Sequence, residues 1–237
     1  MTKRILVAVG LLLLVSFALL SKYEDRTALR NLDFAVTVKV QERIDRSTHL
    51  RLADFVGNVM EGATYFAAPL FTSIAVLMLT GLVIYDKKRK RIRWKSMLIP
   101  IGFLLILMAE LFGKSIVHHP SPPFGMIKHP TSVFPANYVN EQFSYPSGHA
   151  ARAVYIAIAA VYYIWAVLSG KNTTRKRAYI LVSGAIAVTY VVLVSVSRIY
   201  LGEHWFTDVI GGLFLGSSLG VLTWVSMATY NRKTMSD

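Results

Sequence analysis

Cysteine is absent from this chain of 237 residues, and charged residues are scarce. Without a thiol there can be no disulfide and no thiolate metal site. Asp, Glu, Lys and Arg together make up 16% of the residues, against about 25% in ordinary soluble domains. Hydrophobic residues make up 54%. This composition excludes an ordinary soluble domain and indicates an integral membrane protein.

Acidic residues are half as frequent as basic ones, and the basic excess lies in short segments between apolar runs. In a soluble protein a formal net charge of +13 would suggest a nucleic-acid partner. Short loops rich in Lys and Arg between apolar segments instead indicate the cytoplasmic side of a membrane protein. We therefore expect no nucleic-acid partner and a multi-pass location in the cell membrane.

Six segments are long and apolar enough, or nearly so, to cross a bilayer as a helix of roughly 20 residues. They are Ile5–Leu20, Gly62–Tyr85, Ser96–Gly113, His149–Ser169, Ala178–Ser197 and Thr207–Tyr230. The first could instead be a cleaved signal peptide, but no small-residue cleavage site follows it, and we expect it to be retained. Because no repeat or low-complexity tract divides the chain, we expect residues 1–237 to form one all-α domain, a bundle of six transmembrane helices.

Loop charge predicts the orientation of these helices. Asp86–Lys95 holds seven basic residues and one acidic residue, and Gly170–Arg177 holds four basic residues and no acidic one. Both loops and both termini are therefore expected on the cytoplasmic side. All six histidines lie within or at the edge of the intervening segments, Ser21–Glu61, Lys114–Gly148 and Arg198–Phe206. The candidate chemistry therefore converges on the extracytoplasmic face.

The first outward segment contains a stretch with partly helical spacing of apolar residues, Ala28–Ile44. Because charged residues interrupt the apolar ones, we expect one or two amphipathic helices lying at the outer membrane interface. Two roles remain open for this segment, a packed cap over the bundle and a gate for substrate.

A short polar motif, Pro146–His149, opens the fourth apolar run. Ser147 is a good helix N-cap, and Gly148 lets the backbone approach a ligand closely. Free amides and the positive end of the helix dipole would make this an anion site. His149 would lie in the first helical turn, where it could give a proton to a leaving oxygen. The alternative is a capped helix start with an interfacial histidine.

A second polar motif lies between the last two apolar runs, from Ser197 to Asp208. His204 and Asp208 are four residues apart, so on a helix they share one face. A carboxylate beside an imidazole fixes its tautomer and supports its positive form. Together with Lys114 and Arg198, also at the ends of apolar runs, the two motifs indicate phosphoryl chemistry at a membrane surface.

These motifs resemble those of the type 2 phosphatidic acid phosphatases, which include membrane lipid phosphatases and vanadium haloperoxidases. The family pattern is Lys, six residues, Arg-Pro; then Pro-Ser-Gly-His; then Ser-Arg, five residues, His, three residues, Asp. The second part is complete at Pro146–His149, and the third is complete from Ser197 to Asp208. The first part keeps Lys114 and Pro122 but has Ser121 in place of Arg.

The resemblance implies a phosphatase that hydrolyses a lipid phosphate or pyrophosphate without a metal or another cofactor. His204 would form a phosphohistidine, Asp208 would orient it, and His149 would be the general acid. The residues that would bind the phosphate are Lys114, Ser147, Gly148 and Arg198. By analogy with bacterial members, an isoprenoid carrier pyrophosphate is the favoured substrate, while phosphatidate and phosphatidylglycerol phosphate also match the chemistry.

Ser121 removes a guanidinium that would bind phosphate in a bidentate manner. We expect His118 or His119 to take part of that role, since His118 shares the face of Lys114 if the helix continues. Arg152, one turn into the fourth span, is the next candidate. The preferred interpretation of Arg152 is a structural ion pair with Glu110, because buried charges normally pair.

Two other classes of function are weighed against an enzyme. The first is a metal site, because side chains chemically suited to bind a metal are present: His118, His119, His149, His204 and Asp208. Their spacing, however, matches no strong zinc signature. A transporter or other non-catalytic anion-binding or lipid-binding membrane protein is the second. Transporter sites commonly lie near the bilayer midplane between inverted repeats, and the sequence displays neither feature.

Overall fold

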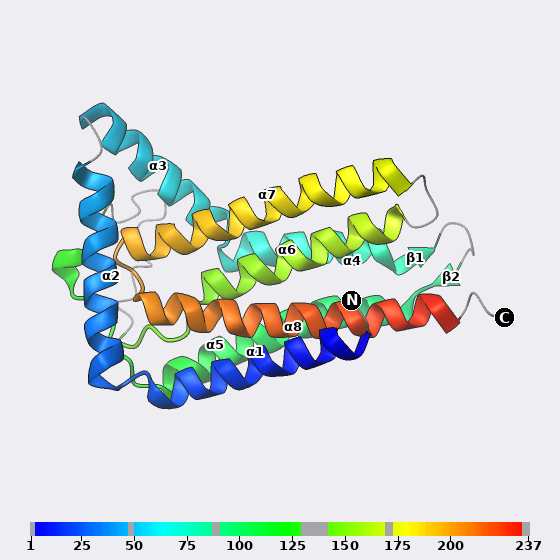
Figure 1. The fold of residues 1–237 in the computed structure, drawn as a ribbon, viewed down its shortest axis with the longest axis horizontal. Helices are drawn as coiled ribbons and strands as arrows, with labels where there is room; N and C mark the ends of the chain where they lie inside the picture. The colour runs from blue at the N-terminus through cyan, green and yellow to red at the C-terminus, as the bar shows by residue number, and fades with distance from the viewer. Residues whose placement is uncertain (1–2, 47–49, 87–90, 129–141, 169–172, 234–237) are drawn as a thin grey trace.

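The computed structural model describes residues 3–46, 50–86, 91–128, 142–168 and 173–233. Within these ranges the chain is almost wholly helical, as predicted, and its long helices other than α2 and α3 run side by side (Figure 1). The helices are α1 (Lys3–Tyr23), α2 (Thr27–Arg46), α3 (Leu50–Phe66), α4 (Pro69–Ile84), α5 (Leu98–Ile116), α6 (Gly148–Val167), α7 (Thr173–Tyr200) and α8 (Phe206–Lys233). Two 3-10 turns, η1 (Trp94–Met97) and η2 (Phe124–Met126), complete the helical elements.

Five of these helices are long and apolar enough to cross a membrane, and α3 with α4 brings the number to six if the bent pair forms one span. The predicted six-span all-α membrane fold is thereby confirmed. The predicted span Gly62–Tyr85 is not one straight helix, because α3 ends at Phe66 and α4 begins at Pro69 with a bend of 52°. Proline lacks an N–H and is suited to the first turn of a new helix, which explains the break at this position.

Helix α8 packs closely against α6 through glycines spaced four residues apart. A Cβ atom at Gly212 would lie 2.3 Å from the carbonyl oxygen of Ser147, and one at Gly216 would lie 2.2 Å from that of Ala151. Small residues at such spacing let two membrane helices approach at backbone distance. The contact brings the first turns of α6 and α8 together, and the Ser147 N–H donates to the Asp208 carbonyl oxygen at 3.0 Å.

The amino-terminal helix α1 packs on the other side of α8. The Ser218 hydroxyl donates to the Gly10 carbonyl oxygen at 2.8 Å, and a Cβ at Gly10 would press on Leu222. At the other end of α1, the Ser21 hydroxyl lies 3.1 Å from that of Tyr145. The first apolar segment is therefore an integral part of the bundle in this fold.

Helix α2 crosses one end of the bundle (Figure 1). It is one helix, as the spacing of Ala28–Ile44 allowed, and its buried residues are polar: Asp33, Thr37 and Gln41. Phe34, by contrast, is 57% exposed. The side-chain amide of Gln41 donates to the carbonyl oxygens of Met126 and Tyr200 at 2.8 and 3.0 Å. The helix is thus fastened to the bundle by polar contacts, which agrees with the packed-cap interpretation.

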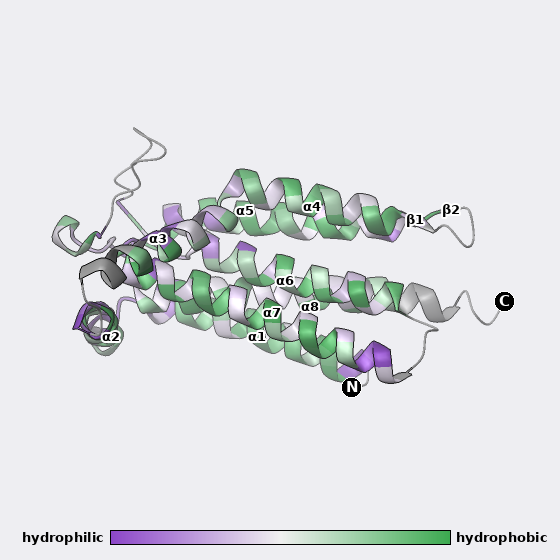
Figure 2. Ribbon diagram, turned by 90° about the horizontal axis from the view of Figure 1, so that it is seen from above, coloured by the Kyte–Doolittle hydropathy of each residue, from purple (hydrophilic) through white to green (hydrophobic). Residues whose placement is uncertain are grey.

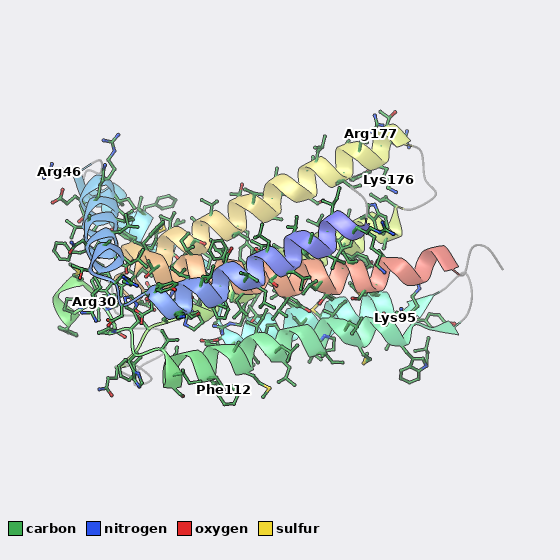
Figure 3. All side chains as sticks on the ribbon, turned by 60° about the horizontal axis from the view of Figure 1, so that its bottom comes forward. Arg30, Arg46, Lys95, Phe112, Lys176 and Arg177 are labelled. Atoms are coloured by element: carbon green, nitrogen blue, oxygen red, sulfur yellow. The ribbon has the colours of Figure 1, made fainter. Side chains whose placement is uncertain are left out.

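Hydrophilic residues gather toward the ends of the bundle, while hydrophobic residues prevail along the helices between them (Figure 2). Figure 3 shows Lys95, Lys176 and Arg177 at the end opposite α2. Phe112 on α5 is 58% exposed along the side of the bundle. At the basic end, strands β1 (Tyr85–Asp86) and β2 (Arg91–Ile92) form a short antiparallel ribbon that the sequence did not predict.

The close approach of α6 and α8 predicts a site-specific sensitivity to one methyl group. Gly216→Ala should destabilise the protein by about 1–3 kcal/mol, because the new Cβ must push against backbone. Gly184→Ala on α7 is the matched control, since a Cβ there meets nothing within 4 Å. Thermal unfolding of the two variants in detergent measures the difference, and equal melting temperatures would contradict this account of the packing.

Candidate active site

The end of α7 and the loop that follows it place Arg198 beside His204. The chain reverses at Gly202, whose φ of 71° lies in the left-handed region that favours glycine. The N–H groups of Glu203 and His204 both point at the carbonyl oxygen of Arg198, each at 3.2 Å. A Cβ at Gly202 would lie 2.1 Å from the carbonyl oxygen of Met126, so this turn has room for no side chain.

Asp208 lies in the first turn of α8, where its side chain caps the start of the helix. The Trp205 N–H, at the N-cap position, donates to Asp208 Oδ2 at 2.8 Å, which is one half of a capping box. The N–H and hydroxyl of Thr207 both donate to the carboxylate of Asp33 at 2.7 Å. Backbone donors at the start of a helix need such partners, and the helix dipole favours negative charge there. Asp208 is fully buried as a result.

His204 lies against Asp208, as the four-residue spacing predicts. Its Nδ1 atom is 3.6 Å from Asp208 Oδ2, and its side chain is 6% exposed. That separation is a few tenths of an ångström longer than a hydrogen bond. Nδ1 of His204 has no hydrogen-bond partner among the described residues. A small movement of the ring would therefore complete a bond to the carboxylate.

The start of α6 contributes a serine hydroxyl and a histidine to the same region. Ser147 occupies the N-cap position but makes no side-chain cap, and its buried hydroxyl has no partner among the residues that the structure describes. His149 lies close enough to Arg198, Arg152, His204 and Lys114 for their charges to act on it. The structure thus brings His149, His204, Arg198 and Lys114 together from three helices and a loop.

Each nearby cation is held by a carboxylate of this chain. Glu110 on α5 contacts Lys114 at 3.7 Å and also pairs with Arg152, which confirms the predicted Glu110–Arg152 pair. A Cβ at Gly148 would lie 2.0 Å from the Glu110 carboxyl group, so that carboxyl group lies against the start of α6. Arg198 pairs with Glu203.

Two of these guanidinium groups retain donors that are not engaged. Arg152 is 1% exposed, and its Nε donates to the Ala67 carbonyl oxygen at 3.2 Å. Nη2 of Arg152 and Nε of Arg198 have no hydrogen-bond partner within the described ranges. Buried donors without partners are costly, and they favour an anion that would accept from them.

The structure places His118 and His119 elsewhere than the sequence analysis expected. Helix α5 ends at Ile116 and the chain becomes extended at Val117, so His118 does not share the face of Lys114. The cause is Pro120, since a helix ends before a proline that lacks the N–H to continue it. The extended segment pairs with the chain near Phe143, through an isolated bridge between Pro120 and Phe143.

The two histidines then face in different directions. His118 is exposed and its ring lies edge-on to that of Phe143, with centroids 4.8 Å apart. His119 is 2% exposed, and its Nδ1 is 2.8 Å from Asp208 Oδ1. His119 therefore lies among carboxylates behind Asp208 and outside the group of cations. His49 and His129 lie outside the described residues.

Several acidic residues around the site were not singled out by sequence reasoning. Glu203 lies inside the third motif, beside His204, and its spacing of five residues from Arg198 gave no helical signal. Asp33 and Glu24 reach the site from α2 and from the link before it, and a polar stripe on α2 was the one available hint. In the part of the chain that is described, no three His, Cys, Asp or Glu side chains are grouped as metal ligands.

Comparisons with known proteins agree with this geometry. Residues 96–232 match the PAP2 superfamily. Phosphatidylglycerophosphatase B of Bacillus subtilis is 30% identical over 176 residues, which are 74% of this chain and 77% of that protein. Undecaprenyl-diphosphatase of Sulfolobus acidocaldarius is 27% identical over 164 residues, 69% of each chain.

A solved structure shares the fold. The crystal structure of the first transmembrane PAP2 type phosphatidylglycerolphosphate phosphatase from Bacillus subtilis superposes with a TM-score of 0.66. The superposition covers 94% of this chain and 96% of the other at 23% identity, a level at which the likeness concerns the fold alone. With the family match spanning more than half of its length and both relatives being phosphatases, the chain belongs to the PAP2 superfamily as a membrane-embedded phosphatase.

Proposed function

We propose that this phosphatase hydrolyses a lipid phosphate or pyrophosphate at the outer face of the membrane through a phosphohistidine on His204. The observation that carries the proposal is the pairing of His204 with the buried Asp208, next to His149 and Arg198. A paired imidazole among cations has the parts that phosphoryl transfer needs: a nucleophile, a proton donor and positive charge.

In the first step Asp208 accepts a hydrogen bond from the Nδ1–H group of His204, which leaves the Nε2 lone pair free to attack phosphorus. The Nε2–P bond forms as the bond from phosphorus to the leaving oxygen breaks, and His149 gives that oxygen its proton. In the second step the oxygen of a water molecule bonds to phosphorus as the Nε2–P bond breaks, His149 takes a proton from that water, and inorganic phosphate leaves. Over the two steps one P–O bond is exchanged for another, and His149 returns to its starting state.

The phosphate cradle is built from Lys114, Arg198, the Ser147 hydroxyl and the first-turn amides of α6, including that of Gly148. An N-terminal helix turn with a serine hydroxyl and no capping bond is suited to a phosphate oxygen. Fixed donors of this kind stabilise the charge that develops on phosphorus without rearranging.

Arg152 is the best candidate to supply the guanidinium that Ser121 lacks. It lies three residues after His149 on α6, so both side chains lie on one face of that helix. Its contacts with Ala67 and Glu110 hold the guanidinium in place while leaving Nη2 without a partner among the described residues. This assignment replaces the expectation that His118 or His119 compensates.

We infer that both termini and the basic loops are cytoplasmic and that α2 and the site are extracytoplasmic. The support is that Lys95, Lys176 and Arg177, which belong to the two short basic loops of the sequence, lie at the end of the bundle away from α2 (Figure 3). On that face the substrate is an isoprenoid carrier pyrophosphate, as one relative is an undecaprenyl-diphosphatase. Phosphatidylglycerol phosphate is the second candidate, because the Bacillus relative is named for phosphatidylglycerophosphate.

His204→Ala should lower turnover on the order of 10³-fold or more while the protein elutes and melts like the wild type, because the nucleophile is lost. Purified protein would be assayed for phosphate release from an isoprenoid pyrophosphate, phosphatidate and phosphatidylglycerol phosphate. Quenching the wild type in base should trap an acid-labile phosphoenzyme that maps to His204. A His204→Ala variant that keeps substantial activity would refute the mechanism, and the order of rates on the three lipids identifies the substrate.

Arg152→Met should raise KM about 10- to 100-fold, since a charge-assisted hydrogen bond is worth about 1.5–3 kcal/mol. Because this change also leaves Glu110 without its guanidinium, Ser121→Arg would be added to the same variant. Recovery of KM in the double variant would show that the lost group is a phosphate ligand. An unchanged KM in Arg152→Met, or a defect that Ser121→Arg does not relieve, would contradict the assignment.

The orientation can be tested with single introduced cysteines, because the chain has no cysteine of its own that would react. Arg46→Cys on α2 should react with a membrane-impermeant thiol reagent in intact cells, as its side chain is 80% exposed. Arg177→Cys at the opposite end should react only after the cells are opened. The reverse labelling pattern would overturn the orientation. The loop residue Asn137, another site for such a label, lies outside the described residues.

A further inference from the structure

Asp208 and three other titratable side chains form a buried cluster, in which the three others lie on the side of Asp208 away from His204. His119 Nδ1 is 2.8 Å from Asp208 Oδ1, and His119 Nε2 is 3.5 Å from Asp33 Oδ2 and 3.7 Å from Glu24 Oε2. Relative exposures are 2% for His119, 0% for Asp208, 1% for Asp33 and 6% for Glu24. We call these four residues the His119 cluster. The mechanism above uses Asp208 and leaves the other three without a role.

The cluster joins four segments of the chain, of which the extended segment after α5 carries His119. Asp208 comes from the first turn of α8, Asp33 from α2, and Glu24 from the link between α1 and α2. Asp33 also accepts both hydrogen bonds from Thr207, so it binds the start of α8 and His119 at the same time. The imidazole of His119 therefore lies where α2 is attached to the catalytic end of α8.

The charges around His119 are mostly negative. Asp208, Glu24 and Asp33 face it directly, while Asp25 and Arg30 act on Glu24 from the exposed side. Burial alone would lower the pKa of His119, but the hydrogen bond to Asp208 and the three carboxylates outweigh it and raise that pKa above its ordinary value. Burial also raises the pKa values of Glu24 and Asp33. His119, Glu24 and Asp33 therefore each keep a proton to higher pH than the isolated side chain would.

A protonated His119 fixes the orientation of the Asp208 carboxylate. It donates from Nδ1 to Oδ1, while Trp205 N–H donates to Oδ2. With both oxygens held, the plane of the carboxylate is set, and Oδ2 is the atom nearest to Nδ1 of His204. If His119 lost its Nε2 proton, the Nε2 lone pair would point at the carboxylates of Asp33 and Glu24. Two negatively charged neighbours repel that lone pair and so disfavour the neutral ring.

We propose that His119 is a positioning residue that holds Asp208 in register with the nucleophile His204, and that Glu24 and Asp33 keep His119 charged. The proposal rests on the proposed function, since it assigns a partner to the Asp208–His204 pair. It gives His119 a role through Asp208 and no contact with the substrate. It also makes α2 part of the catalytic framework through Asp33.

The sign of the pH effect follows from the raised pKa. The charged form of His119, and with it the fixed Asp208, is present below the raised pKa of His119 and is lost as pH rises through it. His119 therefore contributes an alkaline limb to the profile of kcat. Because Glu24 helps to hold the charge, Glu24→Gln should move this limb to lower pH by roughly half a unit or more, while kcat on the acidic side of the limb stays at the wild-type level.

His119→Asn is the direct test, because the asparagine amide can still donate toward Asp208 but carries no charge toward Glu24 and Asp33. We expect kcat on isoprenoid pyrophosphate to fall roughly 10- to 100-fold, KM to change little, and the alkaline limb assigned to His119 to disappear. His118→Asn, one residue away and exposed, is the matched control and should keep wild-type kcat, KM and pH profile.

The outcomes separate this proposal from the function on which it rests. If the wild type forms no phosphoenzyme at His204, the proposed function fails first. If the phosphoenzyme forms and His119→Asn keeps wild-type kcat and pH profile, only the role of His119 is overturned. A rise in KM at constant kcat would overturn it too, because it would place His119 in contact with phosphate. If His119→Asn does not fold, Glu24→Gln provides the test. An alkaline limb that stays at the wild-type pH in folded Glu24→Gln would also overturn the role of His119.

Discussion

The site depends on the close approach of α6 to α8 at two glycines of α8. Gly212 and Gly216 let the two helices meet at backbone distance, and this aligns the first turn of one with the first turn of the other. The Ser147–Asp208 hydrogen bond is the visible result at the end of the bundle near α2. Two motifs distant in sequence thereby meet at the starts of these two helices, where the helix dipoles favour negative charge.

The sequence was sufficient for those features that local spacing determines. The apolar runs and basic loops predicted the helices and the membrane fold, and the four-residue interval between His204 and Asp208 predicted their contact. The Glu110–Arg152 pair was also predicted, because a charge within an apolar run needs a partner and Glu110 is the nearest acidic residue in an adjacent span. These inferences rest on one helix, or on a rule about buried charge that holds in any fold.

The remaining features depend on contacts between segments distant in sequence. Nothing near His119 indicates that it meets Asp208, 89 residues later, since this requires α5 to end early and the following segment to pair beside Phe143. The polar stripe on α2 is visible in the sequence, but its apolar residues were a stronger signal than Asp33. Residue type predicted that His119 would bind an anion, and the anion it contacts is a carboxylate of the protein itself.

The carboxylates that hold the cradle cations have a consequence for which lipids the site can retain. Glu110 bridges Lys114 and Arg152, and Glu203 pairs with Arg198, so a phosphate bound as proposed would have to displace these carboxylates from their cations. A phosphodiester headgroup carries one negative charge and offers these cations no more than a carboxylate does. A terminal phosphate or pyrophosphate carries about two or more negative charges. Each cation that exchanges its carboxylate for such a phosphate therefore gains electrostatic attraction. On the proposed mechanism, the abundant diester lipids of the surrounding bilayer would therefore be poor competitors for the site, and the enzyme would act selectively on terminal phosphates within a membrane made mostly of phosphate diesters.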